Sequence, residues 1–537
     1  MIKFDPLSHR FQSQRNVVLS AGGMVATSHP LAAQIGANVL RRGGNAVDAA
    51  IATAIALTIT EPTSNGIGGD CFAIVWHGGR LYGLNSSGPA PVSLSLEELE
   101  KRGLEEIPPV GWIPVTVPGE PAGWAALSER FGKLPFADLF DEPISLAESG
   151  VPVFPTVGVL WKEAYNFYSK LCRGEEVFAP WFESFVPNGS PPKIGSLWFP
   201  SFYADTFRRI GESKASDFYC GELANKILSY SDKTGGYFTG EDLTGFKPEW
   251  VEPVSVRYKG YDIWELPPNG QGLTALIALG ILRKDTQASL FDPQTAHLQI
   301  EAMKLAFSDA LEYISDPYFM EIDYKAFLDD AYLSSHRRLI GENASLPRPG
   351  RPLKGGTVYV AAADREGTMV SYIQSNYMGF GSGLVIPGTG ITLQNRGCCF
   401  SVNPAHPNAM AGGKRPYHTI IPGFITQSGK PVGPFGVMGG FMQPQGHLQV
   451  VMNMIDFNCN PQEALDAPRW QWVEGKKVLV EKDFDRKILQ GLLDRGHQIE
   501  VATEYESFGR GQIIMCDESG MLWGGTEKRC DGYIALG

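Results

Sequence analysis

The sequence predicts a mixed α+β protein, built either as two domains or as one large layered domain. Its 537 residues exceed what one ordinary core needs. Helical periodicity recurs through the first 340 residues, whereas strands and loops predominate from Thr357 onward. A hydrophobic content of 43% and a charged content of 19% are typical of a globular protein.

The N-terminal part predicts short strands followed by two helices. Apolar runs cover 17–20 and 24–28, and a helix is expected from Pro30 to Leu40, with proline in its first turn. Asn45 is a predicted N-cap, with Asp48 three residues later. The next helix, 46–60, is apolar on every face and should therefore be buried.

A glycine-rich loop, Gly66-Ile67-Gly68-Gly69-Asp70, precedes an expected strand at 71–76. The loop lacks the Gly-Lys-Ser/Thr of a phosphate-binding loop. A helix precedes it and a strand follows, which is the reverse of a dinucleotide fingerprint. Close packing of backbone against backbone is the favoured interpretation.

The middle of the chain alternates between irregular and helical patterns. Aromatic residues, prolines and loop formers fill 150–200, and residues 235–262 look irregular and then strand-like. The segment 341–356, rich in proline and glycine, is expected to be an exposed connector. Helices are expected at 204–210, 222–230 and 294–313, the last strongly amphipathic.

The junction Lys354-Gly355-Gly356-Thr357 leads into a predicted hairpin, with strands at 357–363 and 368–374 around a turn at 364–367. A glycine pair before a strand is most often a flexible entry. The alternative is a cut between Gly356 and Thr357. Thr357 would then become an N-terminus whose hydroxyl is the nucleophile and whose amine is the base.

A second glycine pair, Gly439-Gly440, leads into an expected helix at 445–454. Backbone N–H groups left free at such a junction can hold a developing oxyanion. A helix-entry loop without chemistry is the alternative.

The charge, the apolar runs and the cysteines of the sequence limit the kinds of partner and the cellular location that are expected. A net charge of −12 argues against nucleic acid and against an anionic membrane surface. No secretory signal and no apolar run of membrane-spanning length is visible. The eight cysteines include no CxxC pair and no zinc spacing, so we expect reduced thiols, a cytoplasmic location and no metal or organic cofactor.

The chain resembles the gamma-glutamyltranspeptidase family, which includes cephalosporin-type acylases, from about Met24 to Gly532. The matching pieces occur in one order along the chain, which makes the resemblance specific. They are 30–32, 43–50, 66–70, 117–119, 301–307, 356–357, 380–383, 414–416 and 439–440.

This resemblance implies an N-terminal nucleophile hydrolase with a four-layer αββα sandwich. It implies a precursor that cuts itself into a large fragment, 1–356, and a small fragment, 357–537, which remain one intertwined unit. Pairing of two such units as a homodimer is left open.

The resemblance also assigns site residues. Thr357 takes the place of the nucleophile, and Ser375 that of a second threonine which hydrogen-bonds the nucleophile. Gly439 and Gly440 fall on the oxyanion-hole glycines.

The amino-acid clamp of the family is not reproduced. Ser87 replaces the arginine that holds the substrate α-carboxylate, and Cys399 replaces the aspartate that holds the α-amino group. His418 and Thr419 replace two carboxylate-binding serines. Arg396 would supply the missing positive charge or, equally, form a structural ion pair. Substrate contacts are thus expected from Ser87, Arg396, Cys399, His418 and Thr419.

Three functions follow. The first is an amidohydrolase or acyltransferase that acts on γ-glutamyl or similar acyl amides, as in glutathione metabolism. The second is an acylase for a dicarboxylic acyl amide of the glutaryl (cephalosporin) type. The third is an uncut chain that only binds. Weak use of γ-glutamyl compounds is expected, since the clamp lacks its charges.

Overall fold

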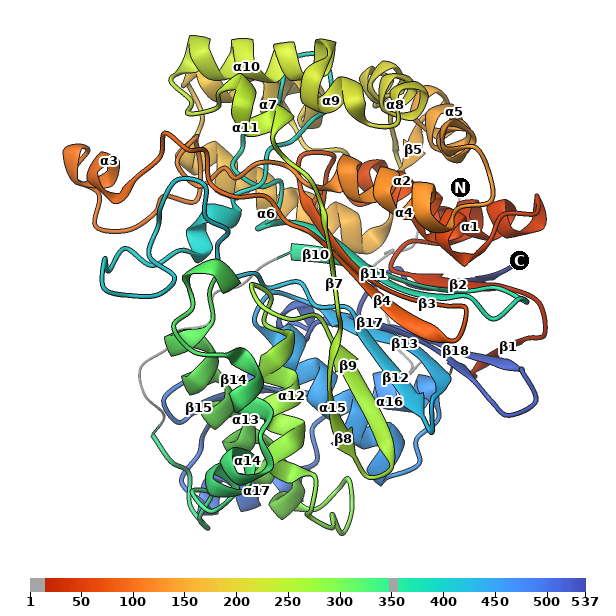
Figure 1. The fold of residues 1–537 in the computed structure, drawn as a ribbon, viewed down its shortest axis with the longest axis vertical. Coiled ribbons are helices and arrows are strands. Elements are labelled where there is room, and N and C mark those ends of the chain that lie inside the picture. The colour runs from red at the N-terminus through yellow and green to blue at the C-terminus, as the bar shows by residue number, and fades with distance from the viewer. Residues whose placement is uncertain (1–14, 347–355) are drawn as a thin grey trace, which may run out of the picture.

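The computed structural model describes residues 15–346 and 356–537 as a mixed α/β molecule of helices and β-sheets, two of which have seven strands each (Figure 1). Expectations for the N-terminal segment 1–14, and for Lys354 and Gly355 of the proposed junction, lie outside the described residues.

One sheet has seven strands in the order β19-β2-β10-β11-β3-β4-β7. All its pairings are antiparallel. Its strands are β2 (Met24–Thr27), β3 (Asp70–His77), β4 (Arg80–Ser86), β7 (Glu249–Val251), β10 (Gly356–Ala363), β11 (Met369–Tyr377) and β19 (Tyr533–Leu536). The expected hairpin is present as β10 and β11, at the centre of this sheet.

The other large sheet also has seven antiparallel strands, in the order β1-β18-β17-β13-β12-β9-β8. They are β1 (Val18–Ser20), β8 (Val254–Tyr258), β9 (Tyr261–Glu265), β12 (Gly423–Gln427), β13 (Lys430–Met438), β17 (Arg510–Cys516) and β18 (Leu522–Thr526). Two small sheets pair β5 (Val151–Pro152) with β6 (Leu197–Trp198), and β14 (Trp470–Glu474) with β15 (Lys477–Glu481) and β16 (Gln498–Ala502).

Alternation of side chains along the strands builds three apolar cores. In β3, Cys71, Ala73 and Val75 join the core under the helices. Phe72, Ile74 and Trp76 point the other way and join the core between the two large sheets. Because successive residues of a strand face opposite sides, a strand buried on both faces reads as a continuous apolar run. A third core lies between the second sheet and its own helices.

The helices divide between the two outer faces. Those of the first group include α1 (Pro30–Arg41), α2 (Ala46–Thr60), α4 (Glu120–Phe131), α5 (Asp141–Ser149), α6 (Pro155–Leu171), α8 (Phe202–Ser213) and α10 (Glu222–Thr234). Those that pack on the second sheet include α12 (Gly272–Leu282), α13 (Pro293–Tyr313) and α15 (Met442–Asp456). Shorter helices are α3 (Leu96–Lys101), α7 (Ala179–Phe185), α9 (Ser216–Cys220), α11 (Gly240–Thr244), α14 (Asp330–Arg337), α16 (Pro461–Asp466) and α17 (Arg486–Asp494).

Helix α2 confirms its sequence-based prediction. Every one of its residues is buried. The Asn45 side chain accepts from the N–H groups of Val47 and Asp48, and the Asp48 carboxylate accepts from the Asn45 N–H. This capping box satisfies backbone donors that burial would otherwise leave unpaired.

The segment 150–200 is more regular than its composition suggests, because α6 spans 17 residues within it. Pro155 stands in the first turn, where its missing N–H is harmless. The aromatic residues pack together instead of forming loops: Trp161 meets Phe185, Trp198 and Phe380 with ring centroids 5.0–6.2 Å apart.

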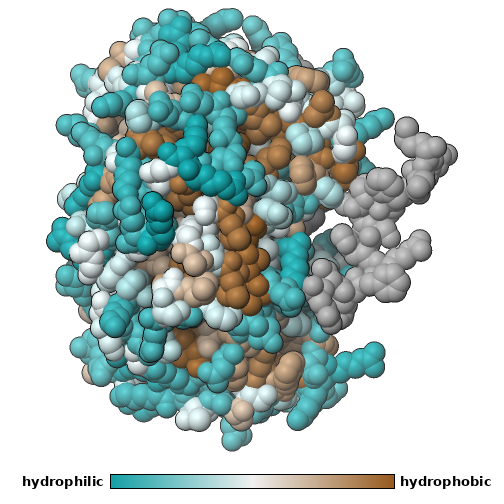
Figure 2. Space-filling view, turned by 90° about the vertical axis from the view of Figure 1, so that its right-hand side faces the viewer, coloured by the Kyte–Doolittle hydropathy of each residue, from teal (hydrophilic) through white to brown (hydrophobic). Residues whose placement is uncertain are grey.

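The surface mixes hydrophilic and hydrophobic residues, and Figure 2 shows hydrophobic groups gathered toward the middle of one face. No helix in the described ranges has both the length and the apolar character needed to cross a bilayer.

Candidate active site

Thr357 lies at the start of β10, beside Ser375 on β11, and both side chains are buried. The pairing between these strands is irregular here: Gly356 faces Tyr377, whereas Val358 faces Gln374. A bulge of this kind re-aims side chains at a strand end. Tyr377 adopts a φ of 76°, which is uncommon for a bulky residue.

Two hydroxyls converge on the Gly356 carbonyl. The Thr357 Oγ1 lies 2.7 Å from the Gly356 oxygen and 3.2 Å from the Ser375 Oγ. The Ser375 hydroxyl donates to the same carbonyl oxygen at 2.6 Å and accepts from the Tyr377 N–H at 2.8 Å. A donor on that oxygen polarises the peptide bond that precedes Thr357.

Gly439 and Gly440 form the turn between β13 and α15, with φ values of 136° and 60° that favour glycine. The Gly440 carbonyl accepts from Gln271 Nε2 at 2.8 Å and from the Gln443 N–H at 3.2 Å, which fixes the orientation of this peptide. Neither glycine N–H makes a hydrogen bond within the described part of the chain. Both donors are therefore available to an incoming oxygen.

One network of contacts links Gly440 to Ser375 and Thr357. Gln271 Nε2 also donates to the Thr419 carbonyl, at 2.5 Å. The Thr419 hydroxyl accepts from Arg396 Nη1 at 2.6 Å. The Arg396 guanidinium carbon lies 4.5 Å from the centre of the Tyr377 ring, and the Tyr377 N–H is bound by Ser375. Thr357, Ser375, Arg396, Thr419 and Gly440 are thus joined, although they are far apart in sequence.

Arg396 is fully buried, yet it forms no ion pair among the described residues. Its Nε and Nη2 atoms have no hydrogen-bond partner there. An unpaired buried guanidinium is energetically unfavourable unless an anion reaches it. The sequence left a choice between a ligand contact and a structural ion pair, and this geometry favours the ligand contact.

Both ring nitrogens of His418 make hydrogen bonds within the protein. Its Nε2 lies 3.0 Å from Asp70 Oδ2, and its Nδ1 accepts from the Ile420 N–H at 3.3 Å. Burial, together with the nearby Arg396 and Arg415, holds the pKa of His418 well below its usual value. The imidazole is therefore neutral, and His418 brings no positive charge to the site.

Asp70, the first residue of β3, is the hydrogen-bond partner of His418. Burial raises the pKa of Asp70 to about 7, against the opposing effect of Arg396. Gly88 N–H donates to its Oδ1 at 3.2 Å. Asp70 is thus held by neighbours of its own.

Ser87 and Cys399, which replace the charged clamp residues, carry no charge here. The Ser87 hydroxyl donates to Asn85 Oδ1 at 2.7 Å, and the Ser87 carbonyl accepts from Arg415 Nε at 2.9 Å. Burial raises the pKa of the Cys399 thiol, while Arg396 opposes this rise. A neutral thiol cannot pair with a substrate ammonium group.

The loop 66–70 is a packing element, as expected. A Cβ atom on Gly68 would lie 2.2 Å from the Thr392 carbonyl oxygen, and one on Gly69 would lie 2.7 Å from the Ser375 carbonyl oxygen. These glycines let the loop press against β11 close to Ser375. They bind no phosphate in this arrangement, because backbone fills the space.

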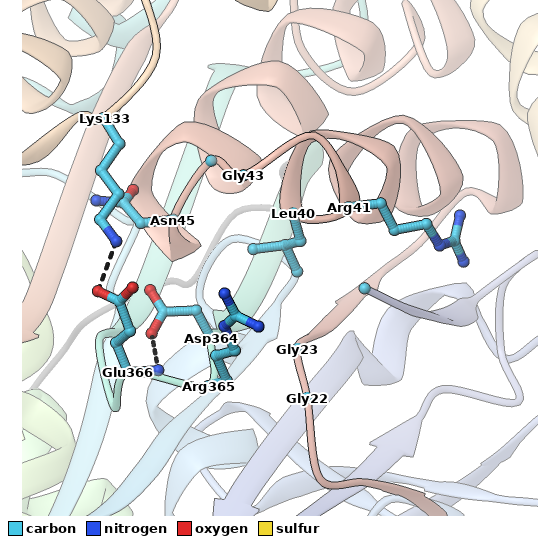
Figure 3. Close-up of a pocket in the computed structure, with 12 residues that line it drawn as sticks. Gly22, Gly23, Leu40, Arg41, Gly43, Asn45, Lys133, Asp364, Arg365 and Glu366 are labelled. Carbon is cyan, nitrogen blue, oxygen red and sulfur yellow. Dashed lines mark hydrogen bonds and ion pairs between the residues drawn. The ribbon is translucent and has the colours of Figure 1, made fainter.

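A separate cavity of about 260 Å³ lies at the opposite end of β10 (Figure 3). It is lined by Asp364, seven residues beyond Thr357 and therefore about 23 Å along the strand. Two pairs of polar groups line it: Lys133 with Glu366, and Asp364 with the Glu366 N–H. This cavity is distinct from the Thr357 site.

Sequence reasoning missed Gln271, Tyr377 and Asp70 as parts of the site. Gln271 begins α12 and bonds residues 148 and 169 positions away. No local pattern signals such contacts.

Comparison with known families and proteins shows what this chain is similar to. The family model described as gamma-glutamyltranspeptidase matches residues 32–537. The chain is 34% identical over 528 residues to the glutathione hydrolase-like YwrD proenzyme of Bacillus subtilis (strain 168), covering 96% of this chain and 98% of that protein.

Two further similarities have different names. The oxamate amidohydrolase proenzyme of Klebsiella pneumoniae is 33% identical, with 96% of this chain and 99% of that protein covered. The crystal structure of a cephalosporin acylase from Bacillus halodurans superimposes with a TM-score of 0.97 and 54% identity, covering 100% of this chain and 99% of that one.

Proposed function

The chain belongs to the gamma-glutamyltranspeptidase family, and on this premise we propose that it is a self-processing amide hydrolase or acyltransferase with Thr357 as its nucleophile. The observation that carries the proposal is the pair of hydroxyls, Thr357 and Ser375, on the carbonyl of Gly356.

Self-processing begins when the Thr357 Oγ attacks the Gly356 carbonyl carbon. A C–O bond forms, the C–N bond between the two residues breaks, and the nitrogen takes the hydroxyl proton. Water then hydrolyses the ester and leaves a carboxylate on Gly356. The products are the fragments 1–356 and 357–537, and Thr357 gains a free α-amine.

Turnover uses the same hydroxyl on the substrate amide. The α-amine, whose ordinary pKa of about 7.7–8.0 suits a base near neutral pH, takes the hydroxyl proton. The N–H groups of Gly439 and Gly440 stabilise the tetrahedral oxyanion. The amine product leaves, and water or a second amine releases the acyl group from Thr357. We assign no metal or organic cofactor to these steps.

The finer architecture that we infer is the four-layer αββα sandwich of N-terminal nucleophile hydrolases. Its support is the succession of three apolar cores: between helices and the first sheet, between the two sheets, and between the second sheet and its helices. The nucleophile would then stand at the end of a central strand, where both sheets contribute to the site.

Two acyl groups compete as the substrate class: γ-glutamyl, and a dicarboxylic acyl group of the glutaryl type. The unpaired Nε and Nη2 of buried Arg396 favour a substrate with a free carboxylate. The uncharged Ser87 and Cys399 offer no negative charge to an α-amino group. These observations support the glutaryl type as the second candidate function.

Steady-state kinetics on γ-glutamyl- and glutaryl-p-nitroanilide test this choice. We expect the glutaryl compound to be used at least as well, and Arg396→Ala to raise its KM with a smaller effect on kcat, because the carboxylate is held alike in the ground and transition states. Arg130→Ala is the matched control, since Arg130 stacks on Tyr82 and Trp250 outside the site. A strong preference for the γ-glutamyl compound would refute the assignment.

The main proposal is tested with Thr357→Ala. This variant should remain one chain and hydrolyse neither anilide, while the wild type gives two bands on a denaturing gel. A single wild-type band near 58.6 kDa without activity would support the uncut binding protein instead.

We further propose a cytoplasmic location, which the eight unpaired cysteines support. A partner surface for nucleic acid or membrane is not part of the proposal. A measurement of the molecular mass of the processed protein in solution would test whether two such units associate as a homodimer.

A further inference from the structure

A buried cluster of His297, Glu301 and His497 lies on the helical side of the second sheet, away from Thr357. His297 and Glu301 are one turn apart on α13, and His497 lies between α17 and β16. One potential ligand atom from each of the three lies within 4.8 Å of the other two, and all three side chains are buried.

The hydrogen bonds of His297 orient its ring. Its Nε2 lies 3.0 Å from the Gly341 carbonyl oxygen, which can only accept, so Nε2 carries the proton. The Nδ1 lone pair of the neutral ring then points at His497 Nε2, 2.9 Å away. His497 Nε2–H therefore donates to this nitrogen, and a bound cation would replace that proton, which can move to His497 Nδ1, an atom without a partner in the described part of the chain. A ring N–H held by a backbone carbonyl orients a histidine that binds a metal through its other nitrogen.

Glu301 is oriented in the same way. The Ser345 N–H donates to Glu301 Oε2 at 3.0 Å, and the Ser345 hydroxyl contacts the same oxygen. The other oxygen, Oε1, lies 3.9 Å from His497 Nε2. A carboxylate with one oxygen held by outer groups presents the second to a shared centre.

The donor set defines the ligand chemistry. Two imidazole nitrogens and one carboxylate oxygen suit Zn²⁺ and related borderline cations, and do not suit Mg²⁺ or Ca²⁺, which prefer oxygen. From this geometry we propose that His297, Glu301 and His497 form a zinc-type metal site.

Lys304 is the competitor for this site. Its Nζ lies 2.7 Å from Glu301 Oε1 and 3.1 Å from the Ser345 carbonyl oxygen. A divalent cation must share or take over Oε1 from this ammonium group. Lys304 therefore limits affinity and makes the site selective for strongly bound cations.

The site would join the two fragments of the processed protein. His297 and Glu301 belong to residues 1–356, and His497 belongs to 357–537. After a cut at Gly356, a bound cation would link the fragments by coordination at a place remote from Thr357. Its effect would therefore be on the stability of the pair and not on the chemistry of the nucleophile.

The test uses the full processed protein, stripped with a chelator and titrated with Zn²⁺ alone by calorimetry. We expect one Zn²⁺ per chain, a higher midpoint of thermal unfolding with Zn²⁺ and no effect of Mg²⁺. Co²⁺ should bind in its place with the visible absorption of a tetrahedral site. His497→Gln should abolish this binding, whereas the exposed control His77→Gln should retain it.

Two variants separate the site from a structural cluster. Ser345→Ala, which keeps all three ligands, should weaken Zn²⁺ binding by about 10–100-fold. Lys304→Met should strengthen it by about tenfold or more, because a neighbouring like charge is removed. Cutting at Gly356, checked on a gel, shows that each variant folds. Wild type without retained Zn²⁺, or equal binding by wild type and His497→Gln, would overturn the proposal.

Discussion

In the proposed reaction, the Ser375 hydroxyl donates a hydrogen bond to the Gly356 carbonyl and the Thr357 hydroxyl attacks it, two roles that one hydroxyl cannot fill together. A hydroxyl has one proton, and Ser375 uses it toward the Gly356 carbonyl while accepting from the Tyr377 N–H. The Thr357 hydroxyl also lies 2.7 Å from this carbonyl oxygen, and in the proposed reaction its oxygen attacks the carbonyl carbon. The substitution of serine for the threonine of the family preserves this arrangement, because only the hydroxyl takes part.

At the residue scale, the oxyanion hole gives a direct prediction. Gly440→Val should lower kcat by about 10²-fold or more, the scale seen for a lost oxyanion donor. Valine disfavours the φ of 60° at this position, so the peptide turns and its N–H leaves the site. The measurement is kcat on the better of the two anilides.

Gly388→Val is the matched control, because Gly388 has a similar φ of 71° on the surface with open space around it. It should lose little activity. If Gly440→Val is processed and as active as the control, the oxyanion assignment is wrong.

At the scale of elements, a buried charge network secures the C-terminal strands. Glu527, just after β18, binds Arg469 at 2.9 Å and Arg529 at 2.6 Å, and it accepts from the Gly511 N–H of β17. Burial alone would raise the pKa of Glu527, but the two arginines prevail and lower it to about 2.

Glu527→Gln should therefore destabilise the protein at pH 7, by about 3–5 kcal/mol, since it leaves the buried Arg469 without its paired carboxylate, whereas Arg529 keeps Glu481. The folded pKa is lower than the ordinary value of 4.5, so the carboxylate stabilises the fold above that value and loses its effect as pH falls toward 2. The difference in thermal midpoint between variant and wild type should narrow in that range.

Glu500→Gln, at an exposed ion pair with Lys477, is the control and should change the midpoint little at any pH. A Glu527→Gln difference that stays constant between pH 7 and pH 3 would contradict the assigned role.

Elements with strong local signals were predictable. The capping box of Asn45 and Asp48 and the all-apolar composition of α2 specify that helix from sequence alone. Helix α6 was not predicted, because its aromatic residues are ordered by partners such as Phe380, far along the chain. Its stability comes from tertiary packing, which local propensity does not contain.

The residues of the candidate site likewise fall into two groups, those that the sequence could predict and those that depend on tertiary contacts. Thr357 and Ser375 follow from a hairpin and a family resemblance, because both sit on adjacent strands. Gln271, which connects Thr419 to Gly440, depends on contacts across the whole fold. The neutral state of His418 is likewise set by burial and by the nearby Arg396 and Arg415, which no spacing reveals.

At the scale of the whole molecule, the proposed cut would leave the fragments interlocked. Strand β10 of residues 357–537 pairs with β2 of the N-terminal part, and β11 pairs with β3. β2 in turn pairs with the C-terminal strand β19. Separation of the fragments would break the central sheet, so we expect them to copurify after processing.

The central claim is that Thr357 becomes a new N-terminus by its own chemistry. The most direct measurement is N-terminal sequencing of the smaller fragment of purified wild-type protein, with Thr357→Ala purified in parallel. We predict Thr-Val-Tyr-Val for the wild-type fragment and no such fragment for the variant. An intact wild-type chain, or a cut in Thr357→Ala at the same bond, would contradict the account.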